Sequence, residues 1–440
     1  MKKILLVGRW GKTHAFAKAI VEKSPQKTEL YCYMDKPNAG IVPLATDYIL
    51  GDMQDNDRII DYALEKKVDF VLAVPHMSLS NSLTDELIER GIRCIGPTKL
   101  CSRLETSKSF LRQMLRETGQ DDVSPEYKVF RAKEDALDHI RSVDHELAVK
   151  PAGVTEGDGV KVVGLQLKDK SEAEEYIQEI FEKNIGGIAE VILEERLVGR
   201  EYTIQAFING ETAVGMPATR DYKLLYEGDK GLNTPGMGSI SFPDHHLPFL
   251  SREEFKGSLA IMQKVVKHLI DKYNEVFVGF LSGQFIKTRD GIKVIEFNVR
   301  PGDSEILNIV PILKTDFVEI CEAMIDDRLS TLDIAFEEKA TVCKYVVGKG
   351  FPHPKGDMFM EIDEEAIKEA GGDLFYSCFA VDRNVFKPSP RGVAVTAKGD
   401  TLEEAYQLCE KLLKENIKGE NIWHRKDIGT EELLEKYTLD

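Results

Sequence analysis

The segment "KVIEFNVRPGDSE", residues 293–305, joins the pattern of a strand to a dense run of polar side chains. Glu296 and Asn298 are two residues apart, so their side chains share one face of the predicted strand. Carboxylate and amide oxygens are ligands that Mg²⁺ prefers, and nucleotide phosphates can complete its coordination. Arg300 continues this face and can bind a phosphate or carboxylate through two parallel hydrogen bonds. The segment therefore predicts a magnesium–nucleotide site, although alternating polar residues also occur on ordinary half-exposed strands.

A glycine-rich segment, "AVKPAGVTEGDGVKVV", occupies residues 148–163. A predicted strand ends at Lys150, and Gly153, Gly157 and Gly159 follow in the loop. The backbone N–H groups of such a loop can surround a triphosphate, while the lysine supplies a positive charge. The pattern indicates a mobile phosphate-binding lid, with an ordinary hairpin as the alternative.

An acidic turn follows in "VILEERLVGRE", residues 191–201. A strand runs into Glu194 and Glu195, bends, and returns with Glu201. A chain that crosses between two domains here can offer backbone groups to an adenine and a carboxylate to ribose hydroxyls. A solvated acidic turn is the simpler interpretation of the segment alone.

The segment "RDYKLLYEGDKGLNTPGMGSIS", residues 220–241, is predicted to be a loop of more than 20 residues. Loops of this length in compact proteins are usually either functional or disordered. Its candidate residues are Asp221, Lys223, Asn233, Thr234, Gly236 and Gly238.

The N-terminal segment "ILLVGRWGKTHAFAKAI", residues 4–20, predicts a strand, a glycine turn and a helix. A turn of this kind can bind an anion through its backbone N–H groups, which makes Gly8, Gly11 and Lys12 candidate substrate-binding residues. Trp10 stands where such a turn favours glycine. Its ring would block close approach of a phosphate unless it turns outward, and it could instead stack on a substrate.

Length and composition limit the class of protein. The chain has 440 residues, which predicts two to four domains, and a formal net charge of -17, which disfavours binding to nucleic acid. The seven cysteines are scattered without a CxxC pair, as in proteins of a reducing compartment. The start, "MKKILLVG", is too short for a signal peptide, and no apolar run approaches the roughly 20 residues of a membrane span. We therefore expect a cytoplasmic protein with no membrane partner.

The order of predicted elements indicates a multidomain protein of α/β and α+β type. Strands alternate with helices over residues 1–100, which predicts a parallel sheet. We expect a helical linker at 101–125, with one helix over "LCSRLETSKSFLRQMLRETG" that ends at a capping glycine. A small lobe at 126–196 precedes an antiparallel core at 197–340, and a small α+β domain occupies 341–440.

The order of these motifs resembles the ATP-grasp fold. A lysine strand, a glycine lid, an acidic hinge and a Glu-x-Asn strand follow one another as they do in that superfamily. The resemblance implies two α+β lobes that hold ATP between them, behind an N-terminal α/β domain that helps to bind the other substrate. Lys108, in "ETSKSF", corresponds to the second phosphate-binding lysine of such proteins.

Over nearly the whole length, the chain resembles the phosphoribosylamine–glycine ligase (glycinamide ribonucleotide synthetase) family. "KPNAG" is similar to the family's "PGNAG", "DKGLNTPGMGSIS" to "DKGPNTGGMGAYSP", and "VIEFNVRPGDSE" to "VIEFNCRFGDPE". "RKDIG", residues 425–429, matches outright. The resemblance implies an ATP-dependent ligase of purine biosynthesis that joins glycine to 5-phosphoribosylamine through a glycyl phosphate, with release of ADP and phosphate.

The resemblance also implies a role for each matching residue. ATP phosphates would be held by Lys108, Lys150 and the glycines Gly153, Gly157 and Gly159, adenine by Glu194 and Leu197, ribose by Glu201, and Mg²⁺ (or Mn²⁺) by Glu296 and Asn298. The catalytic candidates are Arg300, Asp303 and Lys223, and the substrate-binding candidates are Gly8, Trp10, Gly11, Lys12, Asp221, Asn233, Thr234, Gly236 and Glu305.

The departures from the family pattern leave alternatives open. The family's "NGGRE" turn is "RWGKT" here, the loop carries Asp158 where the family often has lysine, and "DHKR" becomes "DYKL". The changes concentrate where the acid and amine substrates would lie. One alternative is therefore the same ligation on a different acid and amine, and a more remote one is a non-catalytic nucleotide-binding protein. The expected partners are small molecules, and the expected state is a monomer or homodimer.

Overall fold

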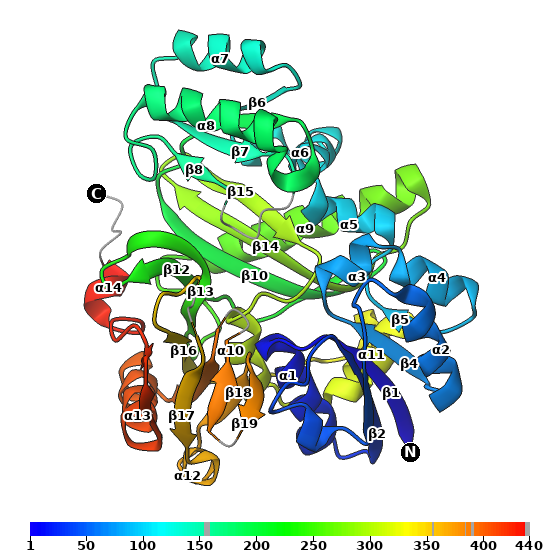
Figure 1. The fold of residues 1–440 in the computed structure, drawn as a ribbon. Helices are drawn as coiled ribbons and strands as arrows, with labels where there is room; N and C mark the ends of the chain where they lie inside the picture. Colours follow the sequence, from blue (N-terminus) through cyan, green and yellow to red (C-terminus); the bar gives the residue numbers. More distant parts are fainter. Residues whose placement is uncertain (154–158, 354–355, 383, 389–390, 436–440) are drawn as a thin grey trace.

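A computed structural model describes residues 1–153, 159–353, 356–382, 384–388 and 391–435 of the chain (Figure 1). The N-terminal residues form a five-stranded parallel sheet in the order β3-β2-β1-β4-β5. Its strands are β1 (Lys2–Val7), β2 (Thr28–Met34), β3 (Asp47–Leu50), β4 (Phe70–Ala73) and β5 (Cys94–Ile95). The apolar residues of β1 and β4 are buried, as expected where helices cover both faces. The predicted parallel-sheet domain is confirmed, although β3, a short edge strand, was not predicted.

Helices follow most of these strands along the chain. They are α1 (Gly11–Lys18), which continues as a π-helix over Ala19–Lys23, α2 (Asn56–Lys66), α3 (His76–Ser80) and α4 (Leu83–Glu89). The short helix α3 was also not predicted.

The prediction of one helix after this domain was wrong. The chain forms α5 (Lys99–Thr106) and α6 (Lys108–Glu117), separated at Ser107. Ser107 has extended backbone angles, φ -139° and ψ 100°, and its hydroxyl accepts a hydrogen bond from the N–H of Phe110. A serine in this role favours a new helix start over continuation. The break places Lys108 at the first position of α6.

Residues 126–196 form a separate lobe at the top of Figure 1, here called the lid lobe. Its antiparallel sheet has the order β6-β9-β7-β8, with strands β6 (Tyr127–Phe130), β7 (Leu147–Pro151), β8 (Lys161–Val162) and β9 (Val191–Glu195). Helices α7 (Lys133–Ser142) and α8 (Lys170–Lys183) pack on it. The apolar side chains of the lid lobe make a core of their own, apart from the two larger cores of the chain.

An antiparallel sheet in the order β11-β10-β14-β15, here called the central sheet, lies below the lid lobe (Figure 1). It consists of β10 (Arg200–Asn209), β11 (Thr212–Gly215), β14 (Val278–Thr288) and β15 (Gly291–Asn298). The long helix α9 (Arg252–Tyr273) packs against this sheet and starts with a capping box formed by Ser251 and Glu254. The predicted antiparallel core is confirmed.

A fourth sheet has the order β12-β13-β16-β21-β18. Its strands are β12 (Arg220–Tyr226), β13 (Lys230–Ser241), β16 (Ala340–Gly348), β18 (Asp373–Tyr376) and β21 (Val393–Gly399). Residues 220–241, predicted to be a long loop, are therefore a hairpin. A Cβ atom at Gly238 would lie 2.2 Å from the carbonyl oxygen of Cys343, so glycine permits the close pairing of β13 with β16. Glycine and irregular pairing together hide the strand pattern from the sequence.

The remaining elements fall between Glu305 and Glu435, and four of their strands pair in the order β19-β20-β17-β22. The helices are α10 (Glu305–Ile312), α11 (Phe317–Ile325), α12 (Glu364–Glu369), α13 (Leu402–Asn416) and α14 (Glu431–Glu435), and the strands are β17 (Met358–Ile362), β19 (Phe379–Asp382), β20 (Val385–Lys387), β22 (Ile417–Glu420) and β23 (Ile422–Trp423). Because β13 pairs with β16, the sheet that contains both strands runs across the predicted domain boundary at residue 340. The domain boundaries stay a prediction. In the described part of the chain, no helix is long and apolar enough to cross a membrane.

The N-terminal domain is joined to the central sheet by a stack of three aromatic rings. Phe16 of α1 is fully buried, with its ring centroid 5.1 Å from that of Phe280 and 4.8 Å from that of Phe317. We expect Phe16→Ala to lower the free energy of unfolding by about 3–5 kcal/mol, because it leaves a cavity at this junction. The control Phe359→Ala, at a side chain that is 42% exposed, should change it by less than about 1 kcal/mol in the same urea titration. Equal effects of the two variants would contradict this account of the junction.

Candidate active site

A buried ion-pair network joins the lid lobe to the central sheet. Arg112 of α6 donates from Nε and Nη2 to the two carboxylate oxygens of Glu194 on β9, at 3.0 and 3.3 Å. The same guanidinium donates to the carbonyl oxygens of Val294 and Ile295 on β15, at 2.9 and 2.8 Å. Lys150 of β7 also pairs with Glu194. Arg112 and Glu194 are almost fully buried, so each charge depends on its partners for the solvation that water would supply.

The protonation state of Glu194 follows from this network. Burial alone would raise the pKa of its carboxyl, but Arg112 and Lys150 outweigh burial and lower the pKa from 4.5 to about 2. Glu194 is therefore a carboxylate at neutral pH.

The second predicted phosphate lysine lies beside the first. Lys108 Nζ donates to the carbonyl oxygen of Gly153 at 3.0 Å, and burial, the largest influence, lowers its pKa, with Lys150 acting in the same direction. A Cβ atom at Gly153 would lie 1.9 Å from the carbonyl oxygen of Gly186, so only glycine fits there. Gly159 faces α8, where its carbonyl accepts a hydrogen bond from Tyr176, and Gly157 lies outside the described residues.

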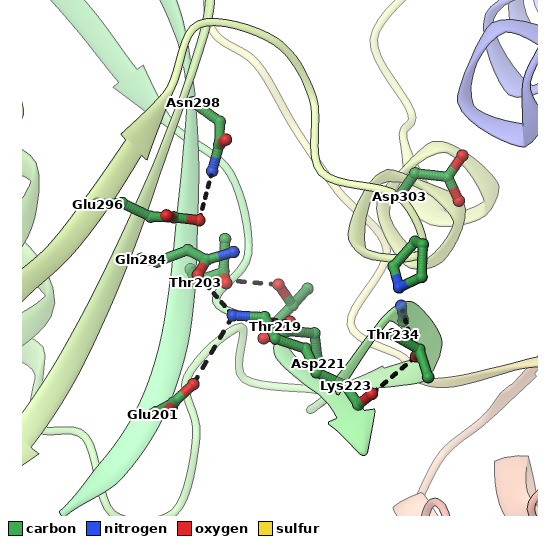
Figure 2. Close-up of polar contacts among 12 residues, drawn as sticks. Glu201, Thr203, Thr219, Asp221, Lys223, Thr234, Gln284, Glu296, Asn298 and Asp303 are labelled. Carbon is green, nitrogen blue, oxygen red and sulfur yellow. Dashed lines mark hydrogen bonds and ion pairs between the residues drawn. The ribbon is translucent and has the colours of Figure 1, made fainter. Parts of the chain in front are cut away.

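The predicted metal ligands meet at the end of β15, as Figure 2 shows. Asn298 Nδ2 lies 3.4 Å from Glu296 Oε1. Burial tends to raise the pKa of the Glu296 carboxyl, but nearby Lys223, Lys108 and Lys150 together lower it below its ordinary value. An ionised carboxylate next to an amide oxygen suits a hard divalent cation.

Arg300 lies beyond the end of the strand rather than on it. Its Nη2 is 3.3 Å from Asn298 Oδ1, and its Nε donates to Glu105 Oε1 at 3.0 Å. Glu105, from α5, also accepts the N–H of Val299 at 2.9 Å and so fixes the chain where it leaves the strand.

Lys223 of β12 lies among acceptors on the face that carries Glu296 (Figure 2). Its Nζ donates to Gln284 Oε1 at 2.6 Å and is 3.5 Å from Asp221 and 3.8 Å from Glu201. Burial opposes its charge, but Asp221 and Glu201 prevail and raise its pKa. Gln284 is paired with Glu296 across the ladder between β14 and β15. Its hydrogen bond with Lys223 therefore holds the lysine close to the predicted metal ligand Glu296.

The carboxylate of Asp303 joins three parts of the chain. It accepts the backbone N–H of Lys12 at 3.1 Å and the hydroxyl of Tyr345, and it pairs with Arg391 Nη2 at 2.9 Å. Arg391 also donates to the carbonyl of Gly236 at 3.2 Å. A Cβ atom at Gly11 would lie 2.3 Å from the Tyr345 hydroxyl oxygen, so glycine is required at this contact.

Trp10 and Lys12 occupy the turn that the sequence singles out. Trp10 precedes α1 with ordinary extended angles, φ -84° and ψ 177°, and its half-buried ring lies 4.7 Å from the Arg9 guanidinium carbon. Burial, together with Arg300, lowers the pKa of the Lys12 ammonium to about 7.

Asp221 and Glu305, two of the predicted substrate-binding residues, place their carboxyl groups near each other. Burial, followed by the charge of Asp221, raises the pKa of Glu305 to about 7. Glu305 begins α10, and its carboxylate lies against Gly302.

The structure brings most of the predicted residues into one region. For a few of them, the described contacts do not involve the other predicted residues. Thr234 joins the region because its hydroxyl donates to the Lys223 carbonyl at 2.7 Å. Gly8 instead donates its N–H to the carbonyl of Tyr33, Leu197 is half-buried in the turn after β9, and Asn233 pairs with Leu224 in the β12–β13 ladder.

Sequence reasoning missed five residues of this region, which are Glu105, Arg112, Gln284, Tyr345 and Arg391. Gln284 alone had a local signal, since it alternates with apolar residues on a strand that the pattern had identified. The others reach the site from distant segments. The charged residues among them, Glu105, Arg112 and Arg391, are recognised only by their contacts with partners from distant parts of the chain.

Within the described ranges, no group of three His, Cys, Asp or Glu side chains is placed to hold a metal ion. Glu296 and Asn298 supply at most three oxygens, two from the carboxylate and one from the amide. They fit a cation that also binds the phosphates of a nucleotide, with the two buried lysines opposite.

The sheets, the paired lysines and the Glu-x-Asn strand end together define an ATP-grasp protein. Residues 2–105 match the family "Phosphoribosylglycinamide synthetase, N domain", and residues 106–306 match "Phosphoribosylglycinamide synthetase, ATP-grasp (A) domain". A phosphoribosylamine–glycine ligase of Methanopyrus kandleri is 42% identical over 99% of this chain and 98% of its own length. One from Methanocaldococcus jannaschii is 41% identical over the same shares. The chain belongs to the phosphoribosylglycinamide synthetase family.

Solved structures support the fold. The phosphoribosylamine–glycine ligase of Thermotoga maritima superposes with a TM-score of 0.79 at 22% identity, over 97% of this chain and all of that one. A biotin carboxylase domain of Hydrogenobacter thermophilus 2-oxoglutarate carboxylase, in complex with MgADP, gives 0.74 at 14% identity over 99% and 95% of the two chains.

The lowered pKa of Glu194 predicts an acid-sensitive contribution to stability. Because the pKa falls from 4.5 to about 2 on folding, the contribution is complete above pH 4.5 and is lost as the pH falls toward 2. Glu194→Gln should therefore flatten this part of the curve of unfolding free energy against pH. At pH 7 it should cost about 3–5 kcal/mol, since Arg112 and Lys150 keep buried charges without a carboxylate.

The matched control is Glu190→Gln, whose partner Arg131 is exposed. It should leave both the stability and its pH dependence nearly unchanged. An unchanged acid limb in the Glu194 variant, measured by urea titrations at several pH values, would contradict the assignment.

Proposed function

We propose that this chain is an ATP-dependent carboxylate–amine ligase that converts 5-phosphoribosylamine, glycine and ATP to glycinamide ribonucleotide, ADP and phosphate. The observation that carries the proposal is the strand end of Glu296 and Asn298, which faces two buried lysines and continues directly into Arg300. Full-length relatives named phosphoribosylamine–glycine ligase, about 40% identical, supply the substrate pair.

On the nucleotide side, Lys108 and Lys150 would bind phosphate oxygens, and Glu194 and Leu197 would border the adenine. Glu201, exposed at the start of β10, would reach the ribose hydroxyls. Mg²⁺ or Mn²⁺, held by Glu296 and Asn298 together with phosphate oxygens, would neutralise charge on the transferring phosphoryl group. The fixed cations around this position lower the cost of bringing two anions together.

On the substrate side, Arg300 is placed to orient the glycine carboxylate toward the terminal phosphate. Its guanidinium is fixed at Nε by Glu105, and Nη1 and Nη2 make one longer contact each, to the Pro301 carbonyl and to Asn298, so each Nη atom keeps a second N–H for a ligand. Lys223, held ionised by Asp221 and Glu201, supplies a second positive charge beside the oxygens of the glycyl phosphate. The amine of phosphoribosylamine then displaces phosphate, and Glu305, whose pKa is about 7, is suited to accept the proton released by the amine.

The setting of the reaction is also a proposal. We place the enzyme in the cytoplasm, because its cysteines are free and the family acts on soluble metabolites. We propose a monomer or a homodimer as the working state, which sedimentation velocity will distinguish.

The direct test is the release of ADP and phosphate from Mg-ATP with glycine and freshly made 5-phosphoribosylamine, with other acid and amine pairs in parallel. We expect turnover that requires both substrates, together with a product of the mass of glycinamide ribonucleotide. Turnover only with a different pair would overturn the substrate assignment and leave the ligase chemistry. Nucleotide binding without turnover for any pair would overturn both.

The metal assignment gives a separate prediction. Glu296→Gln removes the charge of one proposed ligand, so it should raise the Mg²⁺ concentration needed for half-maximal rate about tenfold or more and lower kcat. The exposed Glu420→Gln is the control and should match the unchanged protein in the same Mg²⁺ titration. An unchanged Mg²⁺ requirement in Glu296→Gln would remove this residue from the metal site.

A further inference from the structure

The "RKDIG" segment near the end of the chain, residues 425–429, binds the tip of the β12–β13 hairpin. Arg425 is fully buried and donates from Nη1 to the carbonyl of Leu224 and to Asp229, both at 2.8 Å. Its Nε and Nη2 donate to the two oxygens of Asp427 at 2.9 and 2.7 Å. Asp427 in turn accepts the N–H of Gly228 at 2.7 Å. A segment about 200 residues away in sequence thus fixes the hairpin backbone at two points.

The grip falls on the irregular part of the hairpin. Tyr222 pairs with Gly238, but Leu224 pairs with Asn233, so the ladder shifts register between them. At this shift, side chains bind the strand carbonyls. The hydroxyl of Thr234 donates to the carbonyl of Lys223, and Arg425 donates to the next carbonyl, that of Leu224. Side chains therefore fix two adjacent peptide groups.

Lys223 is the residue whose direction depends on these two peptides. Its Cα atom directly precedes the first of these peptides, and its side chain crosses to Gln284 on the neighbouring sheet. A β-bulge commonly re-aims a side chain next to an active site, but it also loses ladder bonds that would hold the backbone. Hydrogen bonds from groups outside the ladder must replace them if the side chain is to keep one direction.

We propose that Arg425 is a positioning residue for Lys223, since by fixing the Leu224 carbonyl and the hairpin tip it keeps the Lys223 ammonium between Gln284, Asp221 and Glu201. The role requires arginine. A planar guanidinium reaches Asp427 with two donors while a third nitrogen binds Leu224 and Asp229, whereas a lysine offers only one point of contact. The effect on catalysis rests on the proposed function, in which Lys223 acts on the acid substrate.

The kinetic test compares Arg425→Met and Arg425→Lys with the unchanged full-length chain. We expect Arg425→Met to lower kcat at least tenfold and to change the KM for ATP less than twofold, because Lys108, Lys150 and Glu194 belong to other elements. Arg425→Lys should recover only part of the rate. A parallel loss in kcat and in ATP binding would indicate general disruption and overturn the proposal.

A substrate-free test separates this proposal from the assigned reaction. Trace acetylation with acetic anhydride, followed by mass spectrometry, measures the reactivity of each lysine. In the unchanged protein Lys223 should react slowly, since its neighbours keep it protonated and half-buried. In Arg425→Met its reactivity should rise at least threefold relative to Lys108, and no rise would overturn the proposal whatever reaction the enzyme catalyses. If the rise occurs without any ligase activity in the unchanged chain, only the proposed function fails.

A milder variant and a control cover the case in which Arg425→Met does not fold. Asp229 has a left-handed backbone, φ 49°, which asparagine tolerates, so Asp229→Asn should weaken the grip without strain. It should raise Lys223 reactivity in the same direction by a smaller factor. Glu227→Gln, which only accepts the N–H of Lys426 at 3.3 Å on the rim of the same contact, should leave Lys223 reactivity and kcat unchanged. An effect of Glu227→Gln equal to that of Asp229→Asn would overturn the proposal.

Discussion

The carboxylate of Asp303 is the contact on which the arrangement of the site depends. It receives one donor from the N-terminal turn, at the N–H of Lys12, and two from the C-terminal part of the chain, at Tyr345 and Arg391. Asp303 itself follows the metal-ligand strand by only a few residues. A buried carboxylate with three donors is stable only if all three stay in place, because each loss exposes the full cost of burying a charge. This one carboxylate therefore holds three parts of the chain together next to the predicted metal ligands.

The charges of the site are balanced in two groups that meet at Glu296. On the lid side, Glu194 is compensated by Arg112 and Lys150, and on the hairpin side Lys223 is compensated by its acidic neighbours. Glu296 feels the lysines of both groups, which explains why it stays ionised although it is buried. A triphosphate carries more negative charge than one divalent cation can neutralise, so these lysines would balance part of the remainder. The protein thus carries in fixed positions the charges that an aqueous reaction would recruit from solvent.

Patterns confined to one element were readable from the sequence, and contacts between distant elements were not. The alternation that places Glu296 and Asn298 on one face is a property of a single strand, as is the position of Lys150 next to the end of β7. Arg112, by contrast, lies on an amphipathic helix, and nothing in its neighbourhood indicates that it reaches Glu194. The hairpin at 220–241 was missed because its register shift and glycines remove the alternation on which strand prediction depends. The break at Ser107 had a local signal, a serine followed by a helical run, but the apolar periodicity continued across it.

Trp10 fits the turn before α1, and the contacts around it show that an N–H group of this turn binds a carboxylate of the protein. A glycine is required where φ is positive or where another group approaches too closely for a Cβ, and neither condition applies at Trp10, whose φ is -84°. The condition does apply one residue later, at Gly11, where Tyr345 leaves no room. The N–H of Lys12 already binds the carboxylate of Asp303, so the positive end of α1 serves an anion of the protein itself. The turn is consequently a structural joint, and a large ring can stand beside it without displacing a ligand from the N–H of Lys12.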